Sequence, residues 1–151
     1  MIYYRNDVKR SGVDGRALKN AAQRLLAAVD EGDSSLSLTL VNDAEIRALN
    51  REHRGKDRAT DVLSFPMIGD RDVSPERMLG DVVISVDTAR RQAAEYDAPL
   101  AREIERLLIH GILHLLGHDH EEAAERAAME SEERRLADAI GMPWPYADAL
   151  G

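Results

Sequence analysis

The chain has 151 residues, 44% of them hydrophobic and 32% charged, which is typical of one compact domain and too apolar for a disordered protein. It contains no cysteine, which excludes disulfides and thiolate ligands and leaves His, Asp and Glu to bind any transition metal. Its formal net charge of −8 opposes non-specific attraction to nucleic acid, although a locally basic groove on an acidic protein can still bind RNA.

Apolar spacing and turn residues predict the elements of the first half of the chain. In chain order they are a strand over 2–4, a helix over 18–29 stopped by Gly32, a strand over 36–41, a short helix over 44–52 capped by Asn42 and Asp43, and a charged loop over 53–60. The short helix and the charged loop carry most of the basic residues discussed below.

The second half is predicted in the same way. It contains a strand over 62–65 ending at Pro66, a loop with Gly69, Ser74 and Pro75, a strand over 81–85, a helix capped by Asp87 or Thr88 and reaching about residue 96, a helix over 99–116 ended by Gly117, and an amphipathic helix over 121–140. Residues 1–151 are therefore expected to form a single α+β domain.

We expect neither export nor membrane insertion. The amino terminus lacks the basic and then apolar arrangement of a signal peptide. The longest apolar stretch, 107–116, is interrupted by two histidines and is shorter than the roughly 20 residues that a spanning helix needs. The sequence therefore predicts a cytoplasmic protein with no membrane partner.

Four of the five histidines lie in residues 110–120, HGILHLLGHDH. On an α-helix His110 and His114 lie on one face, about 6 Å apart along the axis, so two imidazoles can bind one ion. A third ligand is within reach only if the helix stops at Gly117 and the chain folds back, and geometry leaves His118 and His120 as alternatives. Two buried histidines bonded to backbone are the other interpretation of the pair, but the glycine stop and the further histidine favour a metal.

A three-histidine site leaves one position open for water, which is typical of catalytic zinc. The histidine spacing is also that of metzincin proteases, so a metallopeptidase is a second hypothesis. Those enzymes need a Glu directly after the first His as general base, and this chain has Gly111 there. Peptide hydrolysis by that route is therefore not favoured.

The run over 110–120 resembles the signature of the bacterial YbeY family of single-strand-specific metallo-endoribonucleases that mature ribosomal RNA. Two further stretches agree with the family: NREHR over 50–54 followed by TDVLSFP over 60–66, and LGDVVIS over 79–85. The resemblance implies a zincin-like α+β fold with a small mixed sheet packed with helices. It also implies processing of the 3′ end of small-subunit ribosomal RNA and a part in ribosome quality control.

The resemblance also assigns residues. It implies that His110, His114 and His120 bind the metal, normally zinc, with Ni²⁺ or another divalent transition metal as an alternative, and it places His118 where the family varies. It matches Arg54 to the family's functional arginine, whose planar fork suits a scissile phosphate. The expected partners are single-stranded RNA and the ribosome, not DNA.

Several roles stay open in the sequence. We expect Arg51, Lys56 and Arg58 to contact flanking phosphates, with a solvated charged loop as the alternative for each. Asp81 and Asp119 are either partners that orient imidazoles or a strand-edge acid and a helix cap. The attacking nucleophile is either water activated by the metal or the 2′-hydroxyl of the RNA. A third hypothesis for the whole protein is a non-catalytic ribosome assembly factor whose metal is structural.

Overall fold

The computed structural model describes residues 1–67, 77–118 and 122–142. The elements are β1 (Ile2–Asn6), α1 (Gly15–Ala28), β2 (Ser35–Val41), α2 (Asp43–Arg54), β3 (Val62–Pro66), β4 (Met78–Ser85), α3 (Val86–Glu95), α4 (Leu100–Leu115) and α5 (Ala123–Ala139). The predicted loop with Gly69, Ser74 and Pro75 lies outside the described residues. No helix in the described ranges combines the length and apolar character that crossing a bilayer requires.

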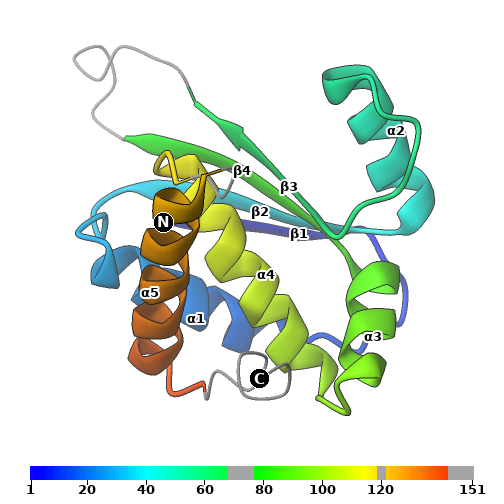
Figure 1. Ribbon diagram of the computed structural model, residues 1–151. Coiled ribbons are helices and arrows are strands. Elements are labelled where there is room, and N and C mark those ends of the chain that lie inside the picture. Colours follow the sequence, from blue (N-terminus) through cyan, green and yellow to red (C-terminus); the bar gives the residue numbers. More distant parts are fainter. Residues whose placement is uncertain (68–76, 119–121, 143–151) are drawn as a thin grey trace.

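The strands form one mixed sheet in the order β1-β2-β4-β3. β1 and β4 each pair parallel to β2, whereas β3 pairs antiparallel to β4 and is an edge strand. Four helices, α1, α3, α4 and α5, lie on one face, and α2 packs on the other (Figure 1). The predicted α+β class with a small mixed sheet is confirmed.

Side-chain alternation along the strands produces two cores. The larger core lies under α1, α4 and α5, where Leu36, Leu38 and Leu40 of β2 are fully buried. The smaller core lies under α2, where Ile46 packs on Val41, Leu63 and Val83. β3 therefore turns Leu63 and Phe65 towards α2, while Ser64 faces α4. This edge strand is in contact with helices on both faces of the sheet.

Three predicted ends of helices are wrong. α1 begins at Gly15, because the carboxylate of Asp14 accepts a hydrogen bond from the backbone N–H of Ala17, and it ends at Ala28, before the predicted stop at Gly32. α2 extends past residue 52 to Arg54 and stops at Gly55, which has a left-handed φ of 68°. The last turn of α2 thus includes residues that were predicted to be in a loop.

The predicted cap of α3 is also wrong. Neither Asp87 nor Thr88 is the cap, because the Ser85 hydroxyl accepts from the N–H of Thr88 one residue before the helix begins. β4 begins at Met78, three residues before the predicted start. The strand extends this far because Ser35 of β2 pairs with Met78 and Pro66 of β3 pairs with Gly80.

Asp43, the first residue of α2, joins α2 to α3. Its carboxylate accepts hydrogen bonds from the hydroxyls of Ser85 (2.6 Å) and Thr88 (2.7 Å), and the guanidinium of Arg91 lies 2.9 Å away. Burial by itself would raise the pKa of Asp43, but these three donors outweigh it and lower the pKa below its ordinary value. The ionised carboxylate therefore stabilises the contact between the two helices.

We predict that Asp43→Asn lowers the free energy of unfolding at pH 7 by about 1–3 kcal/mol, the usual range for a charged hydrogen-bond partner. Because the folded pKa is depressed, this stabilisation is complete above the unfolded value of about 4 and is lost as the pH falls through the folded pKa. Urea unfolding at pH 7 and pH 3 measures the difference, with Glu95→Gln on the exposed side of α3 as the control. A deficit that does not shrink at pH 3 would contradict the electrostatic explanation.

Candidate metal centre and RNA-binding edge

α4 presents its two histidines from a helix that is otherwise mostly buried. Ile104, Leu107, Leu108 and Ile112 fill the core side, whereas His110 and His114 remain partly accessible. Gly117 ends the helix with a left-handed φ of 94°. The N–H of Gly117 donates to the carbonyl of His114, and the N–H of His118 donates to that of Leu113, which is a Schellman motif. The predicted helix stop at Gly117 is confirmed.

The two imidazoles converge. The Nε2 atoms of His110 and His114 lie 3.0 Å apart, and the ring centroids lie 4.5 Å apart at an interplanar angle of 69°. Two nitrogens bound tetrahedrally at zinc, with Zn–N bonds of about 2 Å, lie roughly 3.3 Å apart, so the pair fits one ion after a small adjustment. The predicted pairing of these histidines on one face of α4 is confirmed.

A third ligand is not established. Within 1–67, 77–118 and 122–142 no group of three His, Asp or Glu side chains is arranged to hold a metal. His120 and Asp119 lie outside the described residues, so the third-ligand assignment stays a prediction. His118 is described and is partly buried after the end of α4.

At Gly111, α4 lies close to the sheet. A Cβ atom here would lie 2.8 Å from Cγ1 of Val82 and 3.2 Å from the hydroxyl of Ser64. The Ser64 hydroxyl donates a 3.1 Å hydrogen bond to the Gly111 carbonyl. The residue after His110 is therefore a glycine because a side chain would push α4 away from β3 and β4.

Arg54 lies at the free edge of β3. The backbone carbonyl of Asp61 accepts a hydrogen bond from the N–H of Ser85, and the N–H of Met67 donates to the carbonyl of Leu79. Because hydrogen-bonded residues alternate along an antiparallel strand, the odd-numbered residues of β3 are the ones whose backbone groups bond to β4. The carbonyl of Ser64 therefore points away from the sheet, and it accepts a 3.3 Å hydrogen bond from Nη2 of Arg54. Ser64 thus contacts Arg54 through its carbonyl and the histidine helix through its hydroxyl.

The other predicted basic residues lie near Arg54 in different settings. Arg51 belongs to α2, within the helix predicted over 44–52, whereas Lys56 and Arg58 follow Gly55. The side-chain amide of Asn50, which is 3% exposed, donates to the carbonyl of Arg58, and this bond fixes the loop. Arg51 lies 3.9 Å from the carboxylate of Asp57, so its charge is partly balanced.

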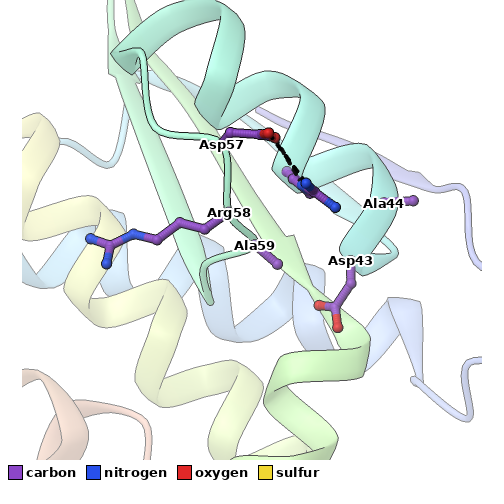
Figure 2. Close-up of a pocket in the computed structure, with 6 residues that line it drawn as sticks. Asp43, Ala44, Asp57, Arg58 and Ala59 are labelled. Atoms are coloured by element: carbon purple, nitrogen blue, oxygen red, sulfur yellow. Dashed lines mark hydrogen bonds and ion pairs between the residues drawn. The ribbon is translucent and has the colours of Figure 1, made fainter.

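Asp57 interacts mainly with Arg47 through two hydrogen bonds of 2.9 and 3.2 Å, and this hydrogen bonding lowers the pKa of Asp57. The pair lines an open pocket of about 410 Å³ together with Asp43, Ala44, Arg58 and Ala59. Figure 2 shows the Arg58 side chain extending away from Asp57 and Asp43. Among the described residues no carboxylate forms an ion pair with Arg54, Lys56 or Arg58.

Comparison with known proteins decides the family. The model of the family described as Endoribonuclease YbeY matches residues 3–141. The chain belongs to the YbeY family. The YbeY proteins named Endoribonuclease YbeY from an Anaeromyxobacter species and from Desulfitobacterium hafniense are 50% and 39% identical to it over 127 and 140 residues, which is 84% and 89% of this chain. The alignment spans 65% of the first relative and 89% of the second.

A solved structure agrees with this membership. The solution structure of TM1509 from Thermotoga maritima superposes with a TM-score of 0.64 and 30% sequence identity, and the match covers 99% of this chain and 93% of that one. The YbeY-type fold predicted from the motifs is therefore confirmed. The chain spans just under two thirds of the length of the two Anaeromyxobacter relatives that it matches.

One residue of this region was missed in the sequence. Glu133 of α5 is buried, and its Oε2 lies 3.8 Å from Nδ1 of His110. Its helical spacing from Met129, Leu136 and Ala137, which are all buried, is the pattern that places it on the core side of α5. An acid on the apolar face of a helix beside a histidine cluster was a signal that the sequence offered.

We predict that Gly111→Ala destabilises the fold by about 1–3 kcal/mol, because an added methyl overpacks the contact with Val82. Val82→Ala creates space at the same point, so the double variant is expected to be more stable than the sum of the single changes implies. Chemical unfolding of the three variants measures this coupling. Additive effects would show that Gly111 and Val82 are not in direct contact.

Proposed function

We propose that this YbeY family member is a single-strand-specific, metal-dependent endoribonuclease acting in 3′ maturation of small-subunit ribosomal RNA and in ribosome quality control. The observation that carries the proposal is the double contact of Ser64. This residue links Arg54, which suits a phosphate, to the helix of the paired histidines. Family membership and the name of its curated relatives support the same activity. The proposed substrate and ribosomal partner imply a cytoplasmic location.

The proposed metal ligands are His110, His114 and His120, with zinc as the expected ion and Ni²⁺ as an alternative. The donor set fits, because imidazole suits zinc and nickel and the chain has no thiolate. A metal bound there supplies Lewis-acid polarisation of the phosphoryl group and activation of a nucleophile at neutral pH. The chain itself holds the first two imidazoles on one rigid helix, so little ordering is needed when the ion binds.

Arg54 is proposed to bind the scissile phosphate. Its side chain is fixed by one hydrogen bond to a backbone carbonyl, and a guanidinium carries five N–H donors, so donors remain for a phosphate. No carboxylate within the described ranges forms an ion pair with it. A positive charge held at this edge stabilises the negative charge that develops on the phosphate in the transition state.

Lys56 and Arg58 are proposed to contact neighbouring phosphates, with Arg51 as a weaker contributor because Asp57 partly balances it. They provide a local positive charge on a chain of net charge −8. Binding at this loop is therefore expected to depend on ionic strength through a small number of phosphate contacts.

Two observations weigh against the peptidase hypothesis. The general-base position of metzincins is Gly111, where Val82 excludes a side chain. Peptides commonly bind to enzymes by adding a strand to a free sheet edge. Here Arg54 already occupies the outward carbonyl of Ser64 on the edge strand β3. We therefore do not propose peptide hydrolysis.

We predict that His114→Ala abolishes metal-dependent cleavage of a single-stranded RNA, a loss of at least about a hundredfold, because metal activation contributes several kcal/mol to such reactions. Zinc content measured on the same samples should fall in parallel. His118→Ala is the control, since no ligand role is proposed for it. Equal cleavage by wild type and His114→Ala would refute the proposal. If RNA processing in cells is retained and the metal is needed only for folding, the assembly-factor hypothesis is favoured instead.

We predict that Arg54→Lys reduces kcat for RNA cleavage by about a hundredfold, because lysine has no planar fork that can bond the Ser64 carbonyl and a phosphate together. Arg51→Lys should change kcat much less. Single-turnover kinetics at saturating RNA measures both effects, and circular dichroism checks that the fold is retained. An Arg54→Lys variant as active as wild type would remove Arg54 from the catalytic machinery.

A further inference from the structure

Glu133 on α5 is a buried acid beside His110, the first histidine of the pair. Glu133 is 8% exposed, and its Oε2 atom lies 3.8 Å from Nδ1 of His110. We propose that Glu133 is a positioning residue that holds the ring of His110 with Nε2 directed at the metal. The inference deepens the proposed function and rests on the metal site proposed above.

The surroundings of Glu133 explain why this carboxylate needs the imidazole. Met129, Leu136 and Ala137, on the same side of α5, are buried hydrophobic residues. A carboxylate in such a setting is unstable without a hydrogen-bond donor or a cation. The nearby Arg135 is bonded to Glu132 at 2.7 Å and to the carbonyl of Ala28, so its charge is already used. Within the described residues, His110 is the only charged or polar side chain shown against Glu133.

The two nitrogens of His110 face different partners. Nε2 lies 3.0 Å from Nε2 of His114, whereas Nδ1 faces Glu133. A carboxylate that accepts the Nδ1 proton leaves the lone pair on Nε2 and fixes the plane of the ring, an arrangement common for metal-binding histidines. The 3.8 Å separation exceeds a hydrogen bond, so a movement of about 1 Å is needed to form one.

A purely structural role predicts a different outcome. If Glu133 served only to pack α5 on α4, an apolar residue of similar size would keep or raise stability and leave metal binding unchanged. If Glu133 positions His110, the same change weakens metal binding while the helix packing is retained. Glu133→Met separates the two roles, because methionine fits the apolar neighbours and offers no acceptor of comparable strength.

The test measures zinc affinity by competition with a chelator for wild type, Glu133→Met, Glu133→Gln and the matched control Glu130→Met on the exposed side of α5. Loss of a residue that orients a ligand typically costs about 10- to 100-fold in affinity. We expect Glu133→Met to lose that much, Glu133→Gln to lose less because its amide oxygen still accepts a hydrogen bond, and Glu130→Met to bind as wild type does. Wild-type affinity in Glu133→Met overturns the inference.

A second measurement tests the inference on the wild-type protein, so that it does not depend on whether Glu133→Met folds. Nitrogen-15 NMR of the imidazoles in metal-free wild type at pH 8 should show the proton of His110 on Nδ1, and a proton on Nε2 instead would overturn the inference even if Glu133→Met does not fold. His114→Ala separates this failure from failure of the proposed function. If His114→Ala binds zinc as tightly as wild type, the metal site itself is wrong and the role of Glu133 falls with it.

Discussion

At Gly111 the backbone of α4 lies so close to the sheet that Val82 leaves no room for a Cβ atom. This contact determines how the histidine helix is placed against β3 and β4. It lets the Ser64 hydroxyl reach the backbone of α4, while the Ser64 carbonyl holds Arg54 at the opposite side of the strand. A single residue of the edge strand therefore sets the relation between the proposed phosphate-binding group and the proposed metal ligands.

The mixed sheet explains why the site lies at β3. Because β3 is the edge strand and runs antiparallel to β4, alternate carbonyls point into open space where a helix on the other face can reach them. α2 packs through Ile46 on the small core and carries Arg54 in its last turn, so the Arg54 side chain reaches that edge. The same hydrogen bond reduces the exposure of an unpaired strand edge, which opposes edge-to-edge association.

Much of this arrangement was predictable from local patterns, and the exceptions have physical causes. The histidine pair and the stop at Gly117 follow from helical spacing and from glycine's access to left-handed φ, so both were found. The start of α3 was missed because Ser85 is both the last strand residue and the cap. The helical spacing of Glu133 could have indicated that it is buried, but its link to His110 depends on α5 packing beside α4, a long-range contact that no local pattern contains.

The distribution of charge bears on how an acidic chain can select RNA. Arg47 and Asp57 neutralise each other, so the positive charge available beside the site reduces mainly to Arg54, Lys56 and Arg58. With a net charge of −8, the rest of the surface repels long polyanions. A flexible single strand can bring a few phosphates to the edge of β3 without laying its remaining length on that surface, whereas a stiff duplex cannot. The preference for single strands in the proposed function thus agrees with the distribution of charge.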